Sequence, residues 1–330
     1  MTFTERVQAV ERFGCSPRQA RFLTLVALHG GYYVRRQYLA ATGTRNGKNA
    51  QRFLDHLVAR QVAARCRYRA DRGYVYRLQH RRLYRAVGLD QNRNRRPAAP
   101  ALIARKLMLL DVVLSEPTAE WVATEGEKVT LFTERFRVSE DDLPRATLVA
   151  QGADAHTERR FKDKLPIALV GEPPVVHFVY LAVDGSVATF ERFLLTHARL
   201  LSALPTWTVL VAHPRHVCAT GLEDACRRFV GDAPALSAAR LRDLERYFLA
   251  RRAIERNELA QLSIADLQSF RSTRLAFAEP RIEALFSRWV ASGALRLDVS
   301  LITSPVPPGR VIVRPLAHTY QQFGAFAGVL

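Results

Sequence analysis

The stretch TRNGKNAQRFLDHLVARQVAARCRYRADRGYVYRL, residues 44–78, decides the fold of the first third of this chain. Its apolar residues Phe53, Leu54 and Leu57 recur at helical spacing and predict one amphipathic helix from Thr44 to about Ala63. Alternating residues on both sides of a turn that contains Gly73 predict a β-hairpin with strands at 65–69 and 74–78. We therefore expect a long helix that leads into a basic hairpin.

Two shorter helices are predicted before this stretch. Ser16 can cap a helix over 17–29, with Pro17 in its first turn and Gly30-Gly31 at its end. Residues 33–41 can form a second helix, closed by Gly43. Three helices followed by a hairpin is the order of a winged helix-turn-helix, whose third helix lies in the major groove while the hairpin reaches the adjacent backbone or minor groove.

Nearly all of the formal net charge lies in the same part of the chain. The protein has 330 residues and a net charge of +18, and residues 1–100 hold 21 Lys or Arg against 5 Asp or Glu. A segment with this much positive charge attracts polyanions, and the phosphate backbone of a nucleic acid is the simplest partner that fits. Only five of the 49 basic residues are lysine, and arginine grips phosphate and guanine bidentately. Codon usage in a GC-rich genome is the alternative explanation for the residue type, but it does not explain the position.

The candidate DNA contacts lie on the third helix, the hairpin and the second helix. Along the third helix, basic and amide side chains recur at i, i+3, i+4 and i+7 and form one stripe. Arginine there pairs well with guanine, and asparagine with adenine. The alternative is an ordinary solvated helix face. The full set is Arg35, Arg36, Arg45, Asn46, Lys48, Asn49, Arg52, His56, Arg65, Arg67, Tyr68, Arg69 and Arg72.

The whole chain is predicted to be an α/β multidomain protein. Residues 1–88 form the winged helix-turn-helix, 89–100 a linker rich in Arg, Asn and Pro, 101–235 an α/β domain, and 236–330 a C-terminal helical domain. In the α/β domain we expect helices at 101–114 and 189–204 and strands at 128–132, 167–170, 175–183 and 206–212. Strand, helix and strand over 175–212 predict a βαβ crossover.

The C-terminal region contains a segment whose sequence is similar to part of the first domain. Residues 51–63 (QRFLDHLVARQVA) align with residues 283–295 (EALFSRWVASGAL) at a constant offset of 232, and a second hairpin is expected to turn at 307–309. A second winged helix is therefore a candidate for this region. Its outward positions are less basic, so it suits dimerisation or partner contact better than DNA reading.

The segment from Ser16 to Gly88 resembles the winged-helix module of the replication-relaxation family of plasmids and other mobile elements. The residues that carry the resemblance are SPRQARFLTLVALHGGYYVRRQYLAA, AQRFLDHLVARQVAARCRY and GYVYRLQHRRLYRAVG. In some members the next domain resembles a restriction-endonuclease fold, whose cleavage site needs an acid and then an acid-x-Lys on a strand. Here no lysine has an acid two positions before it, and Ile167 and Tyr180 stand at the strand positions, so the resemblance implies a degenerate site and a scaffold.

No catalytic constellation or cofactor motif is evident, and we expect no enzyme activity and no cofactor. The four cysteines form no CxxC pair and are expected to be buried thiols. One group has loosely metal-like spacing, although a loop at the end of a strand is the alternative: His213, His216, Cys218 and Cys226. Without a signal segment or a membrane-length apolar run, we expect a cytoplasmic, nucleoid-associated protein that does not bind membranes.

These observations predict a sequence-specific double-stranded DNA-binding protein, a transcription regulator of a bacterial mobile element that acts as a homodimer. One alternative is an accessory protein for replication or transfer of such an element. Another is a nuclease, or a nuclease-derived nucleic-acid-binding component of a defence system. Basic charge does not distinguish between nucleic-acid backbones, so RNA or ribonucleoprotein partners stay open.

Overall fold

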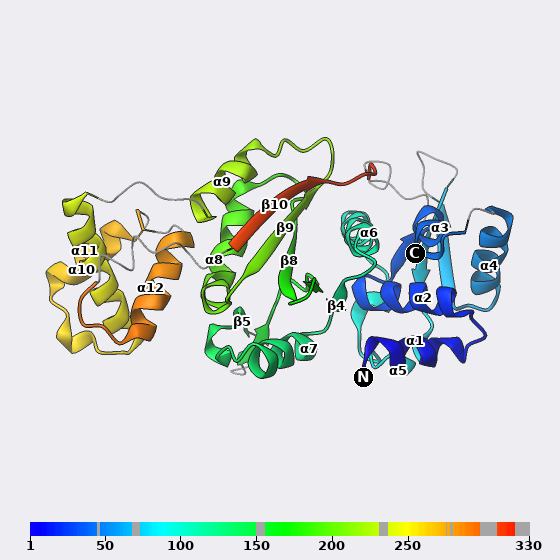
Figure 1. Ribbon diagram of the computed structural model, residues 1–330, viewed down its shortest axis with the longest axis horizontal. Helices are drawn as coiled ribbons and strands as arrows, with labels where there is room; N and C mark the ends of the chain where they lie inside the picture. The colour runs from blue at the N-terminus through cyan, green and yellow to red at the C-terminus, as the bar shows by residue number, and fades with distance from the viewer. Residues whose placement is uncertain are drawn as a thin grey trace.

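The computed structural model describes residues 1–44, 47–67, 73–149, 156–230, 237–274, 276–277, 280–297 and 309–320. They form a mixed α/β structure with three parts along its long axis (Figure 1). A helical unit with a small sheet holds the N-terminus, a larger sheet lies in the middle, and the late helices lie at the other end. No helix in the described ranges has the length and apolarity that a membrane crossing requires.

The N-terminal unit combines helices with a three-stranded antiparallel sheet of order β1-β3-β2. The three helices and the hairpin predicted here are present, and α1, β1 and α5 are additional. The third helix ends at Ala59 rather than Ala63, where strand β2 begins. Because residues 32–34 pair with β3, the second predicted helix begins at Arg35 rather than Tyr33. The elements are α1 (Phe3–Glu11), α2 (Pro17–His29), β1 (Tyr32–Val34), α3 (Arg35–Thr42), α4 (Gly47–Ala59), β2 (Ala63–Arg67), β3 (Tyr74–Leu78) and α5 (Arg81–Ala86).

Helix α6 (Pro100–Ser115) joins the N-terminal unit to the central sheet. Leu110 and Val113 belong to the core of the N-terminal unit, whereas Leu109 and Val112 belong to the core around the large sheet. The segment before it, expected as a linker, contains the 3-10 turn η1 (Arg93–Arg95), where the side chain of Asn94 donates to the carbonyl of Ala27 at 3.2 Å. Residues 89–100 are therefore fastened to the N-terminal unit.

The central sheet has five strands in the order β10-β9-β8-β7-β4. Strands β8, β9 and β10 run parallel, and β7 runs antiparallel to both of its neighbours. Helix α8 connects β8 to β9, which confirms the predicted βαβ crossover. The elements are β4 (Glu120–Val122), β7 (Ile167–Val170), β8 (Val175–Leu181), α8 (Val187–Ala203), β9 (Trp207–His213), α9 (Thr220–Val230) and β10 (Gly309–Pro315).

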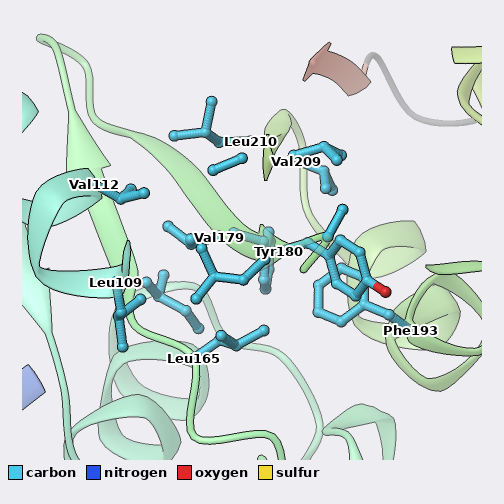
Figure 2. Packing of buried hydrophobic residues seen from close by; sticks show 14 of the residues in the cluster. Leu109, Val112, Leu165, Val179, Tyr180, Phe193, Val209 and Leu210 are labelled. Carbon is cyan, nitrogen blue, oxygen red and sulfur yellow. The ribbon is translucent and has the colours of Figure 1, made fainter. Parts of the chain in front are cut away.

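Helices cover both faces of this sheet, because successive side chains of a strand point to opposite faces. In Figure 2, Leu109 and Val112 of α6 approach the strands from one side, and Phe193 of α8 approaches from the other. The rings of Phe193 and Tyr180 lie 5.0 Å apart. The near-continuous apolar sequence of β8 and β9 follows from this two-sided burial.

The strand predicted at 128–132 is wrong. Thr124 caps helix α7 (Glu125–Thr130), because its hydroxyl accepts a hydrogen bond from the backbone N–H of Glu127. The Glu127 carboxylate in turn accepts a hydrogen bond from the backbone N–H of Thr124. A π-helical turn, η2 (Leu131–Arg135), continues the helix. The cap starts a helix, so the apolar residues that follow pack at helical spacing. The 3-10 turn η3 (Glu140–Asp142) follows, and then a separate two-stranded sheet of β5 (Arg145–Val149) and β6 (His156–Arg160).

The second winged helix expected at 236–330 is also wrong. Helices α10 (Ala238–Glu255), α11 (Ile264–Thr273) and α12 (Pro280–Ser292), with the short turn η4 (Leu259–Gln261), form the late helical part, and α12 packs against α8. The later strand of the expected hairpin, β10, instead pairs with β9 at the edge of the central sheet. The turn expected at 307–309 lies outside the described residues except for Gly309.

The docking of β10 can be tested at Gly309. A Cβ atom there would lie 2.0 Å from the Trp207 ring, and Trp207 is buried. We expect Gly309→Ala to lower the free energy of unfolding by about 1–3 kcal/mol because it overpacks this contact. Thermal or urea unfolding measures the change. The control is Gly126→Ala, where the added Cβ meets nothing within 4 Å. Equal stability of the two variants would contradict the placement of β10.

Acidification provides a second test, at the junction of α2 and β4. His29 is buried against Trp121, with ring centroids 5.8 Å apart, and burial lowers its pKa to about 3. The unfolded chain binds a proton on His29 near its ordinary pKa of 6.5, whereas the folded chain does not until about pH 3. As the pH falls through this window, stability should therefore fall by up to about 1.4 kcal/mol per pH unit. His29→Phe should reduce this slope in urea titrations at several pH values. A slope in His29→Phe as steep as that of the unaltered protein would contradict the assignment.

Candidate nucleic-acid interface

Helix α4 lies at the outer end of the N-terminal unit (Figure 1), and its polar side chains are exposed along one face. Its inner face packs against α3 and β2, with Ala50, Leu54 and Leu57 buried. Phe53 stacks on Tyr38 with ring centroids 5.1 Å apart, which fixes the rotation of the helix about its axis. The predicted contact residues of α4 lie outside this packed face, and Asn49 is exposed: Lys48, Asn49, Arg52 and His56.

The start of α4 is held by Arg35 of α3. The Arg35 guanidinium donates to the carbonyl of Gly47 at 2.9 Å, and a Cβ on Gly47 would lie 2.3 Å from the same guanidinium. A larger residue at position 47 would therefore require the end of the Arg35 side chain to shift. The prediction made Arg35 a phosphate clamp, but its guanidinium hydrogen-bonds the first residue of α4 and so positions that helix.

Arg36 does not belong to the interface, and its prediction as a DNA contact is wrong. Its guanidinium makes a bidentate ion pair with Asp111 of α6, at 2.7 and 2.6 Å, and the two side chains are only 31% and 12% exposed. The Tyr320 hydroxyl also donates to Asp111, and the Arg36 guanidinium lies over the Tyr320 ring. Arg36 therefore fastens α3 to α6. The signal in the sequence is an acid within an apolar helix, since such a carboxylate is rarely buried without a partner.

The hairpin places two predicted arginines beside α4. Arg67 is exposed, and Arg65 pairs with Asp55 of α4 at 2.8 Å while lying over the Tyr74 ring. The side chains of Arg65 and Asp55 are 41% and 48% exposed, so this pair lies at the surface. The charge of Arg65 is thus partly balanced by the protein, and the pair aligns the hairpin with the helix.

Five predicted contacts lie outside the described residues. Two of them come before α4 in the sequence and three come between β2 and β3 in the sequence: Arg45, Asn46, Tyr68, Arg69 and Arg72.

The candidate zinc set is not assembled. His213 is buried, with its ring nitrogen Nδ1 3.0 Å from the carbonyl oxygen of Pro214, and Cys226 lies in the central core. His216 and Cys218 lie outside that core, and the Cys218 thiol lies beside the Thr220 hydroxyl. Throughout the described part of the chain, no three His, Cys, Asp or Glu side chains come together as metal ligands.

One buried polar cluster was missed because Lys128 was placed on a strand. The Lys128 ammonium donates to the carbonyl of Leu165 at 2.6 Å, and His197 lies 3.5 Å from Asp163. Burial lowers the pKa of Lys128 to about 8, and burial also lowers the pKa of His197 against the opposing effect of Asp163. The adjoining cavity is about 10 Å³, room for one water molecule at most. The cluster therefore ties α7 and α8 to the segment before β7.

Comparisons of this chain with protein-family models, with curated proteins and with solved structures find no match. Its function is therefore inferred from the geometry of α4 and the hairpin.

The different roles of Arg36 and Arg52 can be tested by unfolding. Arg36→Ala leaves the largely buried carboxylate of Asp111 without its cation, so we expect a loss of about 2–3 kcal/mol in the free energy of unfolding. Arg52→Ala removes a surface side chain and should change stability by less than about 0.5 kcal/mol. Urea denaturation of both variants measures the difference. A larger loss at Arg52 than at Arg36 would contradict the assignment.

Proposed function

We propose that this chain is a sequence-specific double-stranded DNA-binding protein that acts as a transcription regulator. The observation that carries the proposal is the outward, basic face of α4 beside a basic antiparallel hairpin. The order α2, β1, α3, α4, β2, β3 and the sheet order β1-β3-β2 support a winged helix-turn-helix, with α4 as the recognition helix and the hairpin as the wing.

The dimensions of α4 suit the major groove. Its 13 residues span roughly 20 Å, and a helix fits the roughly 12 Å width of the groove in B-DNA. Arg52 can donate two hydrogen bonds to the edge of guanine. The side-chain amide of Asn49 can donate one hydrogen bond to adenine and accept another from it. Lys48 at the start of the helix and Arg67 on the hairpin lie on the flanks of this face, where backbone phosphates pass.

The central sheet supports a scaffold role for the rest of the chain. The resemblance of this region to a restriction-endonuclease fold implies a scaffold with a degenerate site. Ile167 and Tyr180, at the strand positions where such an enzyme carries its acids, are buried apolar and aromatic residues. We propose that this domain supports dimerisation or sensing while the N-terminal unit reads DNA.

Binding assays on a selected duplex test this function. A target is first enriched from a random duplex pool, and affinity is then measured at several salt concentrations. Arg52→Ala should weaken binding to the selected duplex by about 5- to 150-fold, the equivalent of about 1–3 kcal/mol for one bidentate base contact. If Arg52 also bonds a backbone phosphate, the same substitution should reduce the salt slope by about one unit.

The matched control is Arg192→Ala on α8, which removes a surface helical arginine far from α4. It should leave affinity within about twofold. Equal binding to random and selected duplexes at physiological salt, or equal losses in the two variants, would contradict the proposal. A palindromic target supports a homodimeric regulator, whereas direct repeats near an origin support the replication accessory instead.

A further inference from the structure

A second basic feature of the N-terminal unit is a cavity at the far end of α4. It has a volume of about 430 Å³ and lies between the end of α4, the base of β3, the start of α5 and the turn η1. Every charged or ionisable side chain that lines it is a base: Arg60, Arg77, His80, Arg81, Arg95 and Arg96.

Arg77 is the buried cation of this cavity. It lies on the central strand of the small sheet, opposite Tyr32 of β1 and Ala64 of β2, and is 8% exposed. One terminal nitrogen of its guanidinium donates to the side-chain oxygen of Gln79 at 3.0 Å. The other two nitrogens, Nε and Nη1, are buried without a hydrogen-bond partner, as is Nε of Arg95. Burying a guanidinium with no counter-charge is strongly unfavourable.

The protein supplies little negative charge to this group. Asp90 pairs with Arg81 at 3.3 Å and with Arg85 at 3.4 Å. Among the described residues, no Asp or Glu side chain forms an ion pair with Arg60, Arg77, Arg95 or Arg96. The fold thus gathers several arginines around one cavity and leaves most of their charge unbalanced.

We propose that this cavity binds a small ligand that carries two or more phosphate groups, of the nucleoside di- or triphosphate class. The planar guanidinium fork matches phosphate oxygens in pairs, and several arginines call for more than one negative charge. The volume lies within the roughly 300–1,000 Å³ of small-ligand sites. The amides of Gln61 and Gln79, also in the lining, supply donors and acceptors for the rest of the ligand.

A duplex backbone is the other source of the same chemistry, but the geometry favours a small ligand. Arg77 is buried in the sheet, whereas a duplex contacts side chains that project from a surface. The cavity adjoins the C-terminal end of α4, one helix length of roughly 20 Å from Lys48 at the start of the basic face. The proposal does not depend on DNA binding by that face.

Isothermal titration of the full chain with adenosine diphosphate and with inorganic pyrophosphate tests the site. Both should bind saturably, and adenosine, which has no phosphate, should not. Arg95→Gln and Arg60→Gln should each weaken binding of the diphosphate by about tenfold or more, because each removes a charge-assisted hydrogen bond. Both arginines lie at or near the surface, so these variants should fold, and circular dichroism verifies that they do. Arg77→Gln is a third variant of the same cavity. The matched control Arg192→Gln should retain the affinity.

A duplex arm separates the two phosphate sources. Adenosine diphosphate should bind the protein–duplex complex without displacing the duplex, and the cavity variants should keep duplex affinity within about twofold. The proposal is overturned if neither phosphate compound binds saturably, or if the cavity variants bind it as tightly as Arg192→Gln does. Displacement of the duplex, together with loss of duplex affinity in the cavity variants, would also overturn it by assigning the cavity to the DNA backbone.

Discussion

The packing of α4 against α3 and β2 determines which basic side chains the N-terminal unit presents. Leu54 and Leu57 are buried at this contact, and the Phe53–Tyr38 stack fixes the rotation of the helix. Because side chains repeat every 3.6 residues, burial of the apolar stripe forces Lys48 and Arg52 to the opposite face. The position of the hairpin beside α4 depends on the same contact, since Arg65 of β2 pairs with Asp55 of α4.

The net charge of the first hundred residues is divided among distinct structural roles. Arg36 is neutralised inside the molecule by Asp111, and its ion pair holds α3 against α6. Arg52 lies at the surface of α4, where a polyanion can reach it. Arg77 is buried in the small sheet at a cavity rich in other arginines. Charge alone therefore identifies a basic segment, but only the positions of carboxylates within the fold separate an internal ion pair from a surface that a ligand can approach.

The sequence predicted the local elements well where one periodicity extended over many residues. The apolar spacing along residues 53–62 predicted α4, and alternation around Gly73 predicted the hairpin. Strand β1 was missed because three residues are too few to show an alternation. The strand at 128–132 was wrong although its contrary signal was present, since Thr124 and Glu127 form the capping box of α7.

Long-range pairings account for the rest. The repeat at offset 232 matched the pattern of α12, but no local signal shows that β10 pairs with β9 across some hundred residues of chain. The Arg36–Asp111 pair likewise joins residues that are 75 positions apart. In both cases the local structure was predicted nearly correctly, but the partner was wrong: a hairpin strand for β10, and DNA for Arg36. Tertiary contacts, rather than propensities, thus decided the boundary of the central domain and the membership of the candidate site.

The most direct test of the central claim is photo-crosslinking of the protein to its selected duplex from position 52. A photoreactive amino acid replaces Arg52 on α4 in one variant and Arg192 on α8 in another, both at surface positions of a helix. If α4 lies in the major groove, irradiation crosslinks the duplex from position 52 and not from position 192. Equal crosslinking from both positions, or crosslinking from position 192 alone, would contradict the account.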